Sequence, residues 1–137
     1  MAEQIQFELV SPERLLLSRP VDMVVVPGTE GDFGAMPSHA PFISSLRPGV
    51  IAVYENGQVT DRLFVAGGFA EVTPERCTVL AERALPVSEL NRERIDGELR
   101  DARDDLLEAK DDHDRADAER RVAVGEAMIE AMGAPVY

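Results

Sequence analysis

The sequence predicts a β-sandwich or β-barrel followed by a pair of helices. Up to about Val87, apolar residues alternate along short stretches that glycine and proline interrupt, a pattern typical of strands. From Ser88 onward, apolar residues recur every three or four positions, as on one face of a helix. We therefore predict two domains, residues 1–87 and residues 88–137.

Strand patterns are clearest in three places. Near the start of the chain, Ile5, Phe7 and Leu9 alternate with polar side chains. The dipeptide Asn56-Gly57 predicts a two-residue hairpin turn, because both residue types accept a positive φ. Another interruption of the pattern is expected at Gly67-Gly68. The strands that the hairpin turn would join are residues 50–55 and 58–65.

Two helices are predicted after Ser88, with a turn in the polar cluster 111–114, where Asp114 is expected to cap the second helix. Gly133 and Pro135 are expected to end that helix. The apolar face of the first helix comprises Ile95, Leu99, Ala102 and Leu106, and that of the second comprises Ala118, Val122, Gly125, Ile129 and Met132.

The charge of the chain limits its partners. The net charge is −12, and phosphate neutralisation requires a basic surface, so a nucleic-acid partner is not expected. The same charge argues against adhesion to anionic lipid. No apolar run approaches the roughly 20 residues of a membrane span, so no direct membrane insertion is expected. With Cys77 as the only cysteine and no export signal, a cytoplasmic location is predicted.

No catalytic or metal site is predicted from the residues. The glycine-rich segment 27–34 lacks the Gly-Lys-Ser/Thr ending of a phosphate-binding loop. Ser38 and His39 are neighbours, but no orienting carboxylate or oxyanion motif accompanies them. The cluster around His113 is typical of a solvated turn rather than a metal site. The chain by itself is not expected to be an enzyme.

Two segments resemble the epsilon subunits of bacterial F-type ATP synthases. Residues 26–41, VPGTEGDFGAMPSHAP, followed by LRPG at 46–49, are similar to that family's first signature. Residues 63–72, LFVAGGFAEV, followed by TVLA at 78–81, are similar to its second. The resemblance spans nearly the whole chain and is strongest over the first 85 residues.

The resemblance implies a ten-stranded β-sandwich followed by an antiparallel two-helix hairpin. It implies a non-catalytic rotor subunit that couples proton-driven rotation of the c-ring, through the gamma subunit, to ATP synthesis. Such a subunit is peripheral, at the cytoplasmic face of the bacterial inner membrane. The resemblance places Glu30, Asp32 and His39 at or near the contacts with the c-ring and gamma.

For the helices, the resemblance implies contact with the alpha and beta subunits when the pair extends, and a role in modulating ATP hydrolysis. Some family members bind ATP through an Ile/Leu-Asp-x-x-Arg-Ala motif at the start of the first helix. This chain keeps Arg94, but Asn91 replaces the acid and Ile95 the alanine. The lost charge and added bulk argue against a nucleotide site at Asn91 and Arg94, so no cofactor is expected. A nucleotide-binding sensor of the same fold is the alternative.

Acidic composition also bears on inhibition. Residues 88–137 contain 15 acidic and 8 basic side chains. Helices with this balance should be repelled by acidic surfaces of the catalytic head. Weak intrinsic inhibition of ATP hydrolysis is therefore expected.

Overall fold

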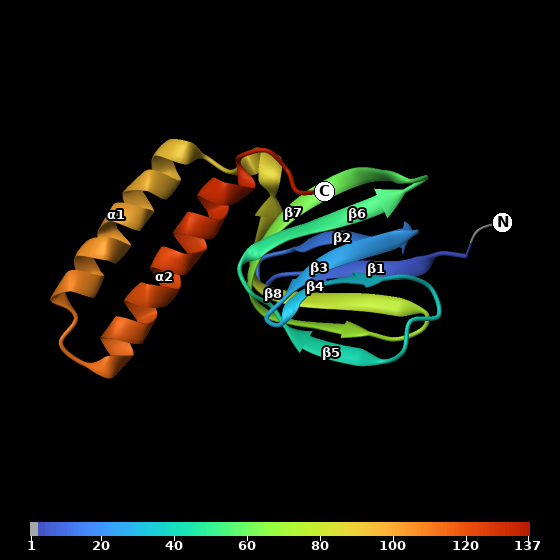
Figure 1. Cartoon of the computed structure of the whole chain (residues 1–137), viewed down its shortest axis with the longest axis horizontal. Helices are drawn as coiled ribbons and strands as arrows, with labels where there is room; N and C mark the ends of the chain where they lie inside the picture. Colours follow the sequence, from blue (N-terminus) through green and yellow to red (C-terminus); the bar gives the residue numbers. More distant parts are fainter. Residues whose placement is uncertain (1–2) are drawn as a thin grey trace. The chain divides into compact units, whose positions relative to one another are not determined.

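The computed structural model describes residues 3–137, which form two compact units. One unit contains the chain up to Val87 together with Tyr137, and the other contains Ser88–Val136. A strand domain followed by two helices was predicted, and this order is confirmed (Figure 1). The elements are β1 (Ile5–Val10), β2 (Leu15–Val21), β3 (Met23–Gly28), β4 (Gly31–Ala35), β5 (Phe42–Ser45), β6 (Gly49–Glu55), β7 (Gln58–Val72), β8 (Arg76–Pro86), the 3-10 turn η1 (Val87–Glu89), α1 (Arg92–Glu108) and α2 (Asp112–Ala131).

The long strands β7 and β8 belong to both layers of the sandwich. Hydrogen bonds connect the strands in the order β2-β1-β8-β7-β6-β3-β4, and β5 pairs with β7. β7 pairs with β6 up to Val65 and with β5 from Phe69 onward. β8 pairs with β1 only between Arg76 and Leu80, although it follows β7 along nearly its whole length. Residues 3–137 therefore contain eight strands rather than the ten expected, because two long strands each contribute to both layers.

A glycine pair bends β7 where it changes partner. Gly67 and Gly68 have φ angles of 71° and 93°, and the register with β8 is the same before the pair, where Ala66 faces Arg83, and after it, where Gly68 faces Ala81. A Cβ atom on Gly68 would lie 1.9 Å from the Leu80 carbonyl oxygen. The interruption expected here is a local change of backbone conformation and does not end the strand, because pairing with β8 continues on both sides of the glycines. The glycines form a bend inside one continuous strand, without a change of register with β8.

Alternate side chains of the strands fill the core, as predicted at the start of the chain. Ile5, Phe7 and Leu9 are fully buried. Each large apolar side chain that is fully buried contributes roughly 1.5–3 kcal/mol to stability. The predicted turn at Asn56-Gly57 is also confirmed, with φ angles of 55° and 76°, and it joins β6 to β7. Other core residues include Val21, Val24, Val26, Ile51, Val53, Val65, Val72, Cys77 and Val79.

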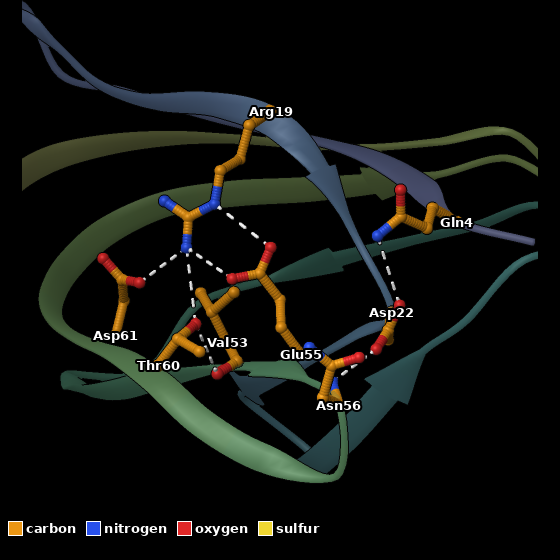
Figure 2. A network of polar contacts seen from close by, with 8 residues as sticks. All are labelled: Gln4, Arg19, Asp22, Val53, Glu55, Asn56, Thr60 and Asp61. Carbon is orange, nitrogen blue, oxygen red and sulfur yellow. Dashed lines mark hydrogen bonds and ion pairs between the residues drawn. The ribbon is translucent and has the colours of Figure 1, made fainter. Parts of the chain in front are cut away.

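One arginine ties this hairpin to the neighbouring strand β2 (Figure 2). Arg19 donates to Asp61 at 2.6 Å and to Glu55 at 3.2 Å. The hydrogen bond to Asp61 has the largest effect on the pKa of the Arg19 guanidinium. Together with the hydrogen bond to Glu55 it outweighs the effect of partial burial and raises this pKa. The backbone N–H of Asn56 donates to Asp22 at 2.7 Å, which holds the turn itself. The network fixes the end of the β6–β7 hairpin.

The helices of the second unit lie side by side (Figure 1). The buried positions of α1 are Ile95, Leu99 and Ala102, three of the four predicted. On α2 the buried positions are Ala118, Gly125 and Met128, so the prediction of Met132 was wrong and that side chain is exposed. A Cβ on Gly125 would lie 3.0 Å from Leu99, which shows how closely the helices approach.

The start of α2 also differs from the prediction. The N-cap is Asp111, whose carboxylate accepts the backbone N–H of Asp114 at 2.8 Å. The predicted cap, Asp114, therefore lies inside the first turn. A carboxylate there is favourable because the helix dipole is positive at its N-terminus.

We predict that Gly68→Ala lowers the free energy of unfolding of the sandwich by about 3 kcal/mol or more. The added methyl group meets a backbone oxygen, and its backbone φ disfavours any side chain. Gly34→Ala is the matched control, since its Cβ would make only an ordinary contact with Met23, and it should change stability by less than about 1 kcal/mol. Calorimetric unfolding of both variants tests this, and equal transition temperatures would contradict the role given to Gly68.

Candidate functional site

The predicted contact residues Glu30 and Asp32 lie on the tight hairpin between β3 and β4. Gly28 and Gly31 are paired across its end, and Gly31 has a φ of 134°, which favours glycine. The side chain of Glu30 is exposed at the tip of this hairpin. No hydrogen bond or ion pair of Glu30 occurs among residues 3–137. Glu30 is therefore a free negative charge on the molecule's surface.

Asp32, in contrast, is held on both carboxylate oxygens. Its Oδ1 accepts a hydrogen bond from the guanidinium of Arg47, and its Oδ2 accepts the hydroxyl of Tyr137 at 2.6 Å. Arg47 also donates to the carbonyl of Gly28 at 2.7 Å, so it braces both strands of the hairpin. Sequence reasoning expected Asp32 to be presented to a partner, whereas its charge is already engaged within the unit.

The contacts of Asp32 change its acidity. Partial burial favours the neutral carboxyl group, but the hydrogen bonds from Tyr137 and Arg47, with the Arg47 charge, outweigh it and lower the pKa of Asp32. The same hydrogen bond raises the pKa of the Tyr137 phenol. Asp32 therefore stays ionised and Tyr137 protonated at neutral pH.

His39 lies on the segment between β4 and β5, apart from the hairpin tip. Its Nδ1 lies 2.6 Å from the carbonyl oxygen of Ala40, and its ring is 6.4 Å from that of Phe42. Phe42 packs edge-on against Phe33 at 5.0 Å between ring centroids. The structure therefore links His39 to β4 through aromatic packing. No hydrogen bond joins His39 to Glu30 or Asp32 within the described part of the chain.

Sequence reasoning missed a row of exposed apolar side chains on the outer face of the sandwich. Phe69, Leu80, Val10 and Leu15 are paired in turn across β7, β8, β1 and β2. Directly paired residues in neighbouring strands lie on the same face of a sheet. Ile43, on β5, lies on the same face one row away, where it pairs with Glu71, while the partner of Phe69 on β5 is Ser45. Val10 is partly buried and the other four residues are exposed. We call these five residues the outer row.

The outer row is unusually exposed for its composition. Ile43 is 66% exposed, Leu15 58%, Phe69 43% and Leu80 42%. Single exposed apolar residues are common, but contiguous ones mark interaction surfaces. No local sequence pattern signals this row, because strand pairing brings its members together from distant positions.

Asn91 and Arg94, the positions aligned with the nucleotide motif, have structural partners. The Asn91 side chain caps α1 by accepting the backbone N–H of Arg94 at 3.0 Å. The Arg94 side chain pairs with Glu98 at 3.3 Å, one turn further along. Both interactions are typical of an ordinary helix start.

Reactive groups are scarce in the described part of the chain. Burial raises the pKa of the Cys77 thiol to about 12, which leaves little thiolate at neutral pH. Among residues 3–137, no group of three or more His, Cys, Asp or Glu side chains could hold a metal ion.

Comparison with known proteins identifies the sandwich. Residues 4–87 match the model of the β-sandwich domain of the ATP synthase delta/epsilon chain. The chain belongs to this family. The ATP synthase epsilon chain of Rhodospirillum rubrum is 56% identical over 131 residues, covering 96% of this chain and 98% of its own length. That of Paramagnetospirillum magneticum is 57% identical over 132 residues, covering 96% and 99%.

Two solved structures contain chains with a similar fold. A chain in the mitochondrial ATP synthase OSCP/F1/c-ring assembly of Euglena gracilis has a TM-score of 0.81 and 25% identity, covering 95% of this chain and 82% of its own length. A chain of the Tetrahymena thermophila central stalk and c-ring has a TM-score of 0.68. This chain is 14% identical, and the match covers 97% of the present chain and 100% of its own length, so it supports the fold alone.

We predict that Asp32→Asn lowers the stability of the sandwich by about 1 kcal/mol at pH 7. A lowered pKa means that the ionised carboxylate is favoured in the folded state. This stabilisation is complete above the ordinary aspartate pKa of about 3.9 and disappears as the pH falls through the lower folded value. The difference in unfolding free energy between Asp32→Asn and wild type should therefore vanish in acid.

Urea unfolding between pH 2 and pH 7 measures this dependence. Glu30→Gln serves as the matched control, because it removes the same charge from the same hairpin without removing a described contact. A constant difference between Asp32→Asn and wild type across the pH range would show that the carboxylate's ionisation is irrelevant.

Proposed function

We propose that this chain is the epsilon subunit of the central stalk of an F-type ATP synthase. It has no catalytic role of its own and couples proton-driven rotation of the c-ring, through gamma, to ATP synthesis. Family membership and nearly full-length relatives named ATP synthase epsilon chain support this function. The observation that carries the proposal is the outer row, since a subunit without chemistry must act through its contacts.

The outer row suits the gamma subunit as its partner. Apolar side chains at the centre of an interface contribute most when they are fully desolvated. Glu8 and Glu71 lie on the same face, one row away, paired across β1, β8 and β7 through Thr78. Glu8 already pairs with Arg76, so Glu71 is the carboxylate of this pair that remains for a partner. A complementary partner therefore presents apolar side chains with a positive charge beside them.

The β3–β4 hairpin and His39 form the second contact region, toward the c-ring. Glu30 offers a free carboxylate at the hairpin tip. Asp32 offers one that is already engaged, and His39 is partly exposed beside an aromatic pair. Single surface charge pairs contribute only about 0–1 kcal/mol, so each residue should affect docking modestly.

Membrane association is proposed to be indirect. Among residues 3–137, no helix combines the length and the apolar character that crossing a bilayer requires. The c-ring would hold the chain at the cytoplasmic face of the bacterial inner membrane as a peripheral subunit.

The helical unit is proposed to contact alpha and beta only weakly. Its surface is dominated by acidic side chains and by ion pairs within the unit, such as Arg92 with Asp96 along α1 and Arg121 of α2 with Asp105 of α1. These pairs neutralise the few arginines within the unit and leave excess negative charge. No observation favours the alternative of a nucleotide sensor, because Asn91 and Arg94 are engaged in the helix start.

We predict that the double variant Ile43→Glu/Leu80→Glu binds purified gamma at least about tenfold more weakly than wild type. Burying two carboxylates against an apolar partner is unfavourable. Leu107→Glu is the matched control, because Leu107 is 86% exposed on α1, outside the outer row. Isothermal titration calorimetry with folded variants tests this, and unchanged affinity would contradict the placement of gamma on this face.

A second prediction concerns inhibition. Removal of residues 88–137 should change the ATP hydrolysis rate of the assembled enzyme less than about twofold, because acidic helices are repelled by acidic surfaces. Steady-state ATPase assays of matched assemblies measure this rate. Strong activation on removal would show that the helices inhibit despite their charge.

A further inference from the structure

Tyr137 is tied to the sandwich at two points. Its hydroxyl donates to Oδ2 of Asp32 at 2.6 Å, across 105 positions of sequence. Its main-chain oxygen accepts two hydrogen bonds from Arg62, from Nη2 at 2.7 Å and from Nε at 3.3 Å. By its contacts Tyr137 belongs to the sandwich unit, although its neighbour Val136 belongs to the helical unit.

The two partners of Asp32 are not equivalent. Arg47 is built into the hairpin, since it also donates to the carbonyl of Gly28. Tyr137 reaches Asp32 from the far end of the sequence and is itself 42% exposed. The phenol is neutral, so a cationic group arriving at Asp32 would add an ionic attraction that the phenol lacks. Tyr137 is therefore the partner that can be displaced.

We propose that Tyr137 is a removable cap on Asp32. While the phenol is bound to Asp32, a cationic side chain of the rotor cannot bind this carboxylate. This inference rests on the proposed function, in which the β3–β4 hairpin faces the c-ring. Arg47 lies against Oδ1 and the phenol against Oδ2, so a cation of the rotor that approaches Oδ2 competes with the phenol for space and for hydrogen bonding there. By thermodynamic linkage, each event weakens the other by the same factor.

The cap couples docking to the helical unit. That unit is joined to the sandwich covalently at Val87 and Ser88, and a second time through Tyr137. Loss of the phenol contact removes one side of the second attachment and leaves only the bonds from Arg62. Engagement of Asp32 by the rotor therefore loosens one end of the helical unit.

The contact can be observed directly in the isolated full chain. The chain contains two tyrosines and no tryptophan, so a Tyr54→Phe background leaves Tyr137 as the only strong fluorophore. A carboxylate that accepts a hydrogen bond from the phenol quenches tyrosine emission. In that background, Asp32→Asn should relieve the quenching, while Glu30→Gln should not. Equal emission from Asp32→Asn and the background protein would overturn the cap.

Competition is tested by affinity for a purified assembly of gamma and the c-ring. Tyr137→Phe should bind about three- to tenfold more tightly than wild type, because no hydrogen bond to the carboxylate must be broken. Tyr54→Phe, which also removes one phenol hydroxyl, should bind like wild type. Arg62→Ala should shift affinity in the same direction as Tyr137→Phe.

The outcomes separate this inference from the proposed function. Tighter binding by Tyr137→Phe, together with relieved quenching in Asp32→Asn, supports the cap. If wild type binds the assembly and Tyr137→Phe binds it with the same affinity, the competition is overturned while the central-stalk function stands. Failure of wild type and all variants to bind the assembly contradicts the proposed function itself, even if the fluorescence shows the contact.

Discussion

The architecture depends on the bend in β7 at Gly67 and Gly68. On one side of this bend β7 hydrogen-bonds to β6, and on the other side to β5. Because β8 follows it throughout, two strands are shared by both layers and no separate connection is required. Only a residue without Cβ can occupy position 68, where the Leu80 carbonyl approaches most closely. The outer row exists because this bend brings β5 beside β7, next to β8 and β1.

Two kinds of surface result from this arrangement, and they suit different partners. The outer row is apolar with carboxylates beside it, as in an interface whose centre is desolvated. The β3–β4 hairpin is acidic and tightly turned, with one free carboxylate and one engaged carboxylate. A subunit that lies between gamma and the c-ring needs an apolar surface for one partner and a polar surface for the other. The physical features of the sandwich therefore agree with a mechanical rather than a chemical role.

The sequence allowed much of the fold to be predicted, since local patterns determine it. Alternation identified Ile5, Phe7 and Leu9 as core, and Asn56-Gly57 identified a hairpin. The interruption expected at Gly67-Gly68 lies inside one continuous strand, because glycine pairs occur in turns and in strand bends alike and only the continuation of pairing distinguishes them. The cap on α2 was misplaced by three residues, since several aspartates in succession satisfy the same pattern.

The candidate site was less predictable. Sequence motifs drew attention to Glu30, Asp32 and His39, but gave no information on what each side chain touches. The partnership of Asp32 with Arg47 and Tyr137 joins positions far apart in the chain, and no local pattern signals it. The outer row is hidden for the same reason, because its five members come from five different strands.

A high-resolution structure of the chain within its own ATP synthase would test the central claim most directly. That claim is that the sandwich transmits torque through its outer row, without substrate chemistry. We expect Val10, Leu15, Ile43, Phe69 and Leu80 to be covered by gamma, and the β3–β4 hairpin to face the c-ring. An outer row left open to solvent in the assembled enzyme would contradict this account.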